Sequence, residues 1–262
     1  MSMNANQLMN KIENSSPVEF GVILNKSIDL FKKVWLQGFI HLLISMIIVV
    51  PLILVLYIPI MALVGIEGVQ ESYGEYPNPF EELSIGLVVL FVILAIIVSI
   101  IASAFQFGVM AHFYRVCRQV DRGKPETSNY FMFFKGRYLK KIITVSIAIF
   151  GISLLAMLLC VIPLFYVLVP LQILGAVFAF NADISTSDLV KASFKFGNKI
   201  WLTAFLLIFI SGLLAELVGL IMCFVGFFFT ASFVYLPIYY MYKDGIGFDD
   251  DSGLEKNIDS VQ

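Results

Sequence analysis

The sequence predicts an all-α integral membrane protein with six membrane-spanning helices arranged as three hairpins. Composition is the first reason, since 60% of the 262 residues are hydrophobic and only 14% are charged, against roughly 45–50% and about 25% in soluble domains. The second reason is that the basic residues gather in clusters separated by long apolar segments. The third is an internal repeat. The net charge of −2 gives no basic excess with which to bind nucleic acid.

The basic residues predict the topology. The 17 Lys and Arg side chains fall into four clusters, at residues 11–33, 115–141, 191–199 and 243–256. The segments between them contain no basic residue: 34–114, 142–190 and 200–242. A membrane helix needs about 20 apolar residues, so each segment holds two spans and returns the chain to the side that it left. The positive-inside rule makes that side cytoplasmic, and we expect both termini there.

We place the six spans, in chain order, at Leu36–Ile66, Leu83–Arg115, Lys141–Val161, Leu164–Phe180, Trp201–Met222 and Phe224–Met241. The first external loop, residues 67–83, holds five Glu and no Lys or Arg. Its charge is therefore opposite to that of the four basic clusters. The other two external turns are very short. Residues 1–16 are polar and lack the pattern of a cleavable signal peptide, so we expect the first span to serve as its own insertion signal.

The sequence predicts three parts. Residues 1–16 form a cytoplasmic N-terminal segment, residues 17–245 a single membrane domain, and residues 246–262 an acidic, disordered cytoplasmic tail. Three Cys predict no disulfide framework. Cys117 is expected to face the reducing cytoplasm. Cys160 and Cys223 lie near the outer boundary and would pair only if their helices touch.

The membrane domain contains a threefold internal repeat, with units at about 17–123, 124–184 and 185–245. Residues 133–165 align without gaps on residues 196–228, which places Tyr138 on Trp201 and Cys160 on Cys223. The first unit joins this alignment at Trp35. Each unit is expected to be a short amphipathic helix on the cytoplasmic side, an aromatic residue followed by Leu, and a two-span hairpin. Ser185 with Asp188 has the spacing of an N-cap for the helix of the last unit, and Thr127 with Ser128 opens the helix of the middle unit.

Basic and aromatic side chains stand together where the amphipathic helices meet the spans. A ring crosses the polarity gradient at the headgroup level, and a neighbouring cation meets lipid phosphate. Candidate contacts to anionic lipid headgroups are Lys32, Lys33, Trp35, Arg137, Tyr138, Lys140, Lys141, Lys199 and Trp201. The alternative, which we favour from sequence, is that these residues only anchor the helix ends.

Short motifs in the second and third units resemble a known family. Residues 159–163 with 166–170, and 188–194 with 199–201, are similar to the six-span bacterial membrane domain attached to some glycerophosphodiester phosphodiesterases and to its stand-alone relatives. The similarity covers most of residues 17–245. It implies a multi-pass protein of the bacterial inner membrane. The phosphodiesterase barrel, with its acidic and His metal ligands, is absent, so the resemblance carries over no catalytic residue.

A few polar residues inside the spans are candidates for an intramembrane site: Glu216, Gln106 and Gln172. Glu216 lies ~22 Å along its span from Trp201, where an ionised carboxylate costs a few kcal/mol unless it is paired, protonated or hydrated. The two histidines, His41 and His112, are either a proton relay or, as we favour, hydrogen-bonded residues near helix ends.

No enzyme motif is found, and the sequence implies no catalytic residue, metal or cofactor. The leading hypothesis is therefore a non-enzymatic inner-membrane protein that interacts with lipid or acts as a scaffold for a membrane partner. The expected partners are membrane lipids, another membrane protein or a second copy of this chain. The alternative hypothesis is a transporter, or a protein that translocates lipid, with a polar cavity near Glu216.

Overall fold

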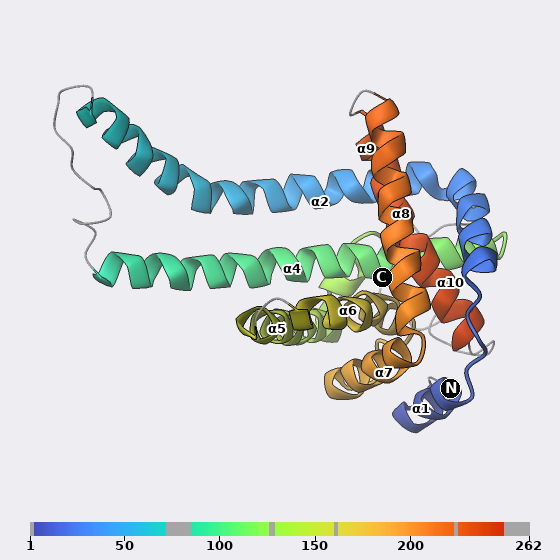
Figure 1. The fold of residues 1–262 in the computed structure, drawn as a ribbon. Coiled ribbons are helices and arrows are strands. Elements are labelled where there is room, and N and C mark those ends of the chain that lie inside the picture. The colour runs from blue at the N-terminus through green and yellow to red at the C-terminus, as the bar shows by residue number, and fades with distance from the viewer. Residues whose placement is uncertain (1–2, 72–84, 126–128, 160–161, 223–224, 249–262) are drawn as a thin grey trace.

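The computed structural model describes residues 3–71, 85–125, 129–159, 162–222 and 225–248 (Figure 1). All regular elements in these ranges are helices, as predicted. They are, in chain order, α1 (Ala5–Glu13), α2 (Phe20–Glu71), α4 (Ile85–Asp121), the 3₁₀ helix η1 (Met132–Phe134), α5 (Gly136–Leu158), α6 (Ile162–Phe180), α7 (Thr186–Lys199), α8 (Trp201–Ile221), α9 (Gly226–Thr230), the 3₁₀ helix η2 (Ala231–Val234) and α10 (Tyr235–Gly245).

Five described helices are long and apolar enough to cross a membrane: α2 over Phe20–Pro59, α4, α5, α6 and α8. The structure therefore has the architecture of a polytopic membrane protein. The sixth predicted span, Phe224–Met241, is not a single long helix, because α9, η2 and α10 divide it. Pro237 has no N–H with which to continue the helical ladder, and the 3₁₀ turn of η2 lies just before it.

The first hairpin pairs α2 with α4, which lie side by side over most of their length (Figure 1). The candidate span in α2, Phe20–Pro59, has 40 residues, but its first turns carry Lys26, Asp29, Lys32 and Lys33. The uncharged stretch 34–59 is ~39 Å long at 1.5 Å per residue, which exceeds a hydrocarbon core of about 30 Å. The amphipathic helix expected before the first span is not separate from it. With no Pro before Pro51, one helix runs on from Phe20 and bends near its start.

The segments that precede the other two hairpins also differ from each other. The middle unit has only the 3₁₀ turn η1 before α5, and Thr127–Ser128, where its helix was expected to begin, lie outside the described residues. The last unit has the separate helix α7, where the predicted N-cap Ser185 accepts a hydrogen bond from the amide of Asp188 at 3.2 Å. The threefold repeat therefore stays a prediction.

The five long helices do not form one parallel bundle. Helices α5 and α6 lie beside α4, whereas α8 crosses α2 and α4 in the view of Figure 1. Helix α8 packs on α9, η2 and α10. Its close approach to the following segment uses glycine, since a Cβ on Gly219 would stand 2.6 Å from the ring of Phe227.

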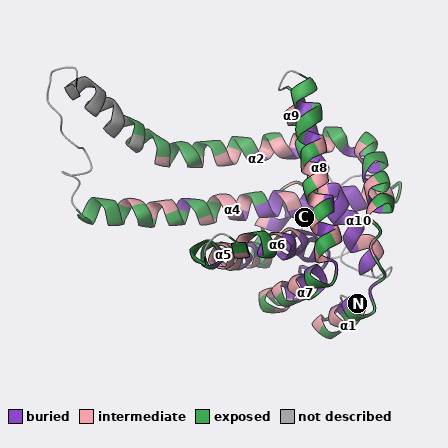
Figure 2. Cartoon of the chain, in the orientation of Figure 1, coloured by how far each residue is buried: buried purple, intermediate pink, exposed green. Residues whose placement is uncertain are grey.

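Burial is concentrated where α10 meets the C-terminal halves of α4 and α6 (Figure 2). The side chains of Tyr239 and Tyr240 donate hydrogen bonds of 2.7 and 3.1 Å to Asp121, which also pairs with Lys243. These contacts tie α10 to the end of α4. By contrast, α2 between Ile47 and Met61 and the first turns of α4 expose mostly apolar side chains (Figure 2), so lipid or another protein must cover them.

Folded structure extends past both ends of the predicted membrane domain. Residues 1–16, predicted to be a cytoplasmic N-terminal segment, contain α1, which a capping box of Asn4 and Gln7 begins and which packs on α7. The predicted tail starts inside the folded part, since Ile246 is buried and the ring of Phe248 lies under the guanidinium of Arg118 at 4.3 Å. The rest of the tail, 249–262, lies outside the described residues.

Candidate functional site: a basic pocket and two intramembrane cavities

A basic pocket lies at the beginning of α5, beside the end of α6. It has a volume of about 280 Å³ and is lined by Arg137, Tyr138, Lys140, Lys141, Thr144, Ala182 and Asp183. Four of these residues were predicted from sequence as headgroup contacts. Because α5 and α6 run antiparallel, the first turn of α5 meets the chain that leaves α6.

The pocket carries more positive than negative charge. Arg137 forms an ion pair of 2.6 Å with Asp183, and its guanidinium also donates to the hydroxyl of Tyr138 at 3.1 Å. Lys141 donates to the carbonyl of Ala182. Within the described part of the chain, the ammonium of Lys140 has no hydrogen-bond or ion-pair partner. Three cations against one carboxylate leave the lining with a charge of about +2.

The helix terminus adds to this positive potential. The first turn of α5 contains no acidic residue, and no side chain caps its free amide groups. A helix N-terminus carries roughly half a positive charge, so cations at this end repel the helix dipole as well as one another. An anion placed in the pocket would relieve both repulsions and would receive hydrogen bonds from amides and side chains.

The other predicted headgroup contacts lie elsewhere. Lys32 pairs with Asp29 on the surface of α2 at 2.8 Å, and Lys33 is exposed next to it. Trp35, also on α2, packs edge-on against Phe229. These three residues are not brought together with the pocket on α5.

The predicted contacts on the third unit bind protein atoms instead. The ammonium of Lys199 donates to the carbonyls of Ile12, Glu13 and Ser15 at 2.9–3.3 Å. The indole of Trp201 donates to the carbonyl of Tyr166 at 3.0 Å. Both side chains therefore hold neighbouring segments in place, and the sequence contains no local signal for this, because their partners are distant in the chain.

A larger cavity of about 430 Å³ lies between α4, α5 and α6 and contains two of the predicted intramembrane polar residues. Gln106 and Gln172 both line it, together with Ser103, Ser153, Phe107, Met110, Ile149, Leu164, Val167, Leu168, Leu171 and Tyr235. The structure thus brings together two amides that lie on different helices. An amide in hydrocarbon without a partner costs roughly 4–8 kcal/mol, so polar contents are expected in this cavity.

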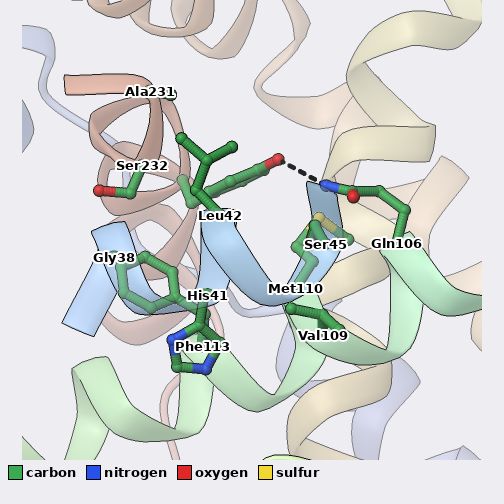
Figure 3. Close-up of a pocket in the computed structure, with 11 residues that line it drawn as sticks. Gly38, His41, Leu42, Ser45, Gln106, Val109, Met110, Phe113, Ala231 and Ser232 are labelled. Carbon is green, nitrogen blue, oxygen red and sulfur yellow. Dashed lines mark hydrogen bonds between the residues drawn. The ribbon is translucent and has the colours of Figure 1, made fainter. Parts of the chain in front are cut away.

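A second, smaller cavity of about 50 Å³ shares Gln106, Met110 and Tyr235 with the first and continues toward His41 (Figure 3). The dashed line in Figure 3 marks the hydrogen bond of 3.4 Å from the amide of Gln106 to the hydroxyl of Tyr235. Ser45 and Ser232 also line this cavity. Polar groups therefore follow one another from Gln172, past the exposed Gln106, to α2.

The two histidines meet at the end of this series of polar groups. His41 Nε2 lies 2.7 Å from His112 Nδ1, both side chains are buried, and the rings stack at 4.9 Å. His41 Nδ1 lies 2.7 Å from the carbonyl oxygen of Gln37. The ring of Tyr130 packs against both imidazoles. Sequence reasoning placed each histidine near a helix end and missed the pair, because no pattern within one helix indicates a contact to another.

Glu216 does not share these sites. Its side chain is exposed on α8, and it is not among the residues that line either cavity. An exposed carboxylate on an apolar helix is near water, headgroups or a partner protein when the protein is in a membrane. Cys160 and Cys223 lie outside the described residues, and Cys117 is a buried free thiol.

Among the described residues, no three His, Cys, Asp or Glu side chains come close enough to hold a metal ion. In comparisons with known proteins, no protein-family model, curated protein or solved structure matches the chain. The resemblance to the membrane domain of glycerophosphodiester phosphodiesterases therefore stays a prediction from sequence.

Proposed function

We propose that this protein is a non-enzymatic, lipid-binding protein of the bacterial inner membrane, and that the basic pocket on α5 binds the phosphate of an anionic lipid. The observation that carries the proposal is the cluster of Arg137, Lys140 and Lys141 at the positive end of a helix dipole. The fold alone does not require three cations there, since they repel one another and the helix terminus. A bound phosphate makes the arrangement favourable.

The geometry is suited to a lipid that remains in the bilayer. Along α5, the face that follows the pocket exposes Ile147, Leu154 and Leu158. A phosphate held by the guanidinium, the ammonium groups and the amides of the first turn would leave its acyl chains beside these side chains. Tyr138 lines the same pocket, at the level where an aromatic ring with a hydroxyl is favoured.

The test is a titration of the purified full-length protein with phosphatidylglycerol and with phosphatidylcholine, with native mass spectrometry as the measurement. We expect the wild type to prefer phosphatidylglycerol. Each cation near a membrane surface contributes about 1 kcal/mol of attraction to anionic lipid. The triple variant R137Q/K140Q/K141Q should therefore bind phosphatidylglycerol at least tenfold more weakly, with phosphatidylcholine binding unchanged.

The matched control is the double variant K32Q/K33Q, which removes exposed charge from α2 outside the pocket. It should retain the preference of the wild type. Equal losses in the two variants would mean that total surface charge, and not the pocket, attracts the lipid, and would contradict the proposal.

One observation favours the alternative function, lipid translocation or transport: the two cavities that meet at Gln106 provide polar groups inside the bilayer. Against it, the lining described for these cavities contains no charged side chain. Proteoliposomes with a fluorescent phosphatidylglycerol separate the two functions. Lipid exchange between leaflets at the rate of protein-free vesicles supports a binding protein, whereas clearly faster exchange supports translocation.

A further inference from the structure

The cavity between α4, α5 and α6 presents hydrogen-bonding groups that the protein itself does not satisfy. In the described part of the structure, the side-chain amide of Gln172 has no hydrogen-bond partner. Gln106 makes one long bond to Tyr235. The hydroxyls of Ser103 and Ser153 line the same space. A folded protein rarely leaves such groups without partners in an apolar environment.

The position of the cavity along the helices places it within the hydrocarbon layer. Gln172 lies near the middle of the 19-residue helix α6. Ser153 is in the second half of α5, well past the basic residues that begin that helix. A molecule that reaches this cavity from the bilayer would therefore bring apolar chains with it.

The charge of the lining selects among lipids. No Asp, Glu, Lys or Arg is among the lining residues, so a phosphate or a fatty-acid carboxylate would find no counter-ion. Ile149 and Ser153 also lie on nearly the opposite face of α5 from Arg137 and Thr144, by the 3.6-residue helical repeat. The cavity is thus a separate site from the basic pocket.

We infer that this cavity binds the glycerol-ester region of an uncharged lipid, of the diacylglycerol class. Ester carbonyls accept hydrogen bonds from the amides of Gln106 and Gln172, and the free hydroxyl of the lipid donates to an amide oxygen. The apolar lining, which includes Phe107 and Leu168, contacts the first part of the acyl chains. The volume of about 430 Å³ falls in the usual range of roughly 300–1,000 Å³ for small-molecule sites.

Water is the competing occupant. The volume would hold roughly 14 molecules at about 30 Å³ each, but seven of the twelve lining residues are apolar. So many waters would exceed the available polar partners, of which each buried water needs about three. A mixed lining of this kind is typical of a site for a molecule that is itself part polar and part apolar.

The test uses a diacylglycerol with a diazirine in its acyl chain, incorporated into phosphatidylcholine nanodiscs that contain the full-length protein. After irradiation, we expect mass spectrometry to find the label on residues 149–172. Unlabelled diacylglycerol should compete, and phosphatidylglycerol should not. Ser153→Leu, which fills the cavity, should reduce labelling at least fivefold, and Gln172→Leu, which keeps the space but removes the amide, should reduce it severalfold.

Ser99→Leu is the matched control, because Ser99 is exposed on α4, and it should label as the wild type does. Undiminished labelling in Ser153→Leu, or label spread evenly over the exposed faces of α2 and α4, would overturn the inference. Phosphatidylglycerol binding by Ser153→Leu shows that this variant is folded. The two proposals can fail separately, since R137Q/K140Q/K141Q should still be labelled by diacylglycerol.

Discussion

The hydrogen bonds of His41 and His112 define the protonation of both rings when they are neutral. The carbonyl oxygen of Gln37 can only accept, so Nδ1 of His41 carries a proton and Nε2 accepts from Nδ1 of His112. Each ring thus depends on the other to satisfy a buried nitrogen. The pair joins α2 to α4 by a specific polar contact within an interface of mostly apolar side chains.

We predict that replacing both histidines destabilises the protein by less than the sum of the two single replacements. His41→Phe or His112→Phe alone leaves a buried nitrogen without its partner and should cost about 1–3 kcal/mol. The double variant removes both nitrogens, so its loss should be smaller than the sum of the single losses. SDS-induced unfolding of the purified variants measures each free energy. Strictly additive losses would show that the two rings do not support each other.

Contacts between residues that lie far apart in the sequence were the hardest to predict. Gln106 and Gln172 were chosen because amides are rare within apolar spans, and this signal lies in each helix by itself. His41 and His112 are 71 residues apart, and their contact depends on the register of α2 against α4. Side-chain packing determines that register. The same stretch of α2 also approaches η2 closely at Gly38, where a Cβ would lie 2.1 Å from Ser232 Oγ.

At the scale of elements, α1 is held on α7 by charge as well as by apolar contacts. Leu8 and Ile12 are buried, Lys195 pairs with Glu13, and Lys199 donates to the carbonyls at the end of α1. A cation at a helix C-terminus is favourable because it compensates the unpaired carbonyls. The short helix is therefore part of the fold, although its polar sequence gave no sign of a docking surface.

We predict that acid weakens the docking of α1 on α7. The hydrogen bond and charge of Lys195 lower the pKa of Glu13 from its ordinary value of 4.5. A carboxylate with a lowered pKa contributes stability above that ordinary value, and the contribution is lost as the pH falls through the lowered value. Hydrogen-exchange protection of α1 should therefore decrease below pH 4.5. The Glu13→Gln variant should show no such step, and an identical step in that variant would contradict the assignment.

Local signals predicted an element well where the signal lies at the start of a separate helix. Ser185 with Asp188 correctly indicated the start of α7. The approach failed for α2, where an amphipathic stretch and an apolar stretch follow each other without a break and form one helix. It also failed for the last span, since a run of apolar residues does not reveal that η2 and Pro237 divide it.

At the scale of the whole molecule, α8 crosses α2 and α4 in the view of Figure 1. The three helices therefore cannot all stand along the membrane normal. Composition and cation-free segments predict how many apolar helices exist, because each must be long enough to cross. They do not predict the angles between helices, which depend on side-chain packing across contacts far apart in sequence. An α8 that runs across the first hairpin is strongly tilted if α2 and α4 stand near the membrane normal.

Topology can be measured with single cysteines in a background that lacks Cys117, Cys160 and Cys223. We expect probes at Lys124 and Lys195 to react with an impermeant maleimide only after the cells are permeabilised, because the positive-inside rule predicts that the basic clusters face the cytoplasm. A probe at Val225, which is exposed between α8 and α9, should react in intact cells if α8 crosses the bilayer. Ala204, which is fully buried on α8, provides the unreactive control.

The probe at Val225 decides between two arrangements of the same fold. Helix α8 has 21 residues, or ~32 Å at 1.5 Å per residue, so it reaches the outer surface only at a modest tilt through a core of about 30 Å. Reaction in intact cells would require the long α2–α4 hairpin to tilt instead. The uncharged stretch 34–59 of α2 permits this, because its length of ~39 Å exceeds the thickness of the core. Reaction only after permeabilisation would place α8 along the cytoplasmic surface and contradict the predicted third hairpin.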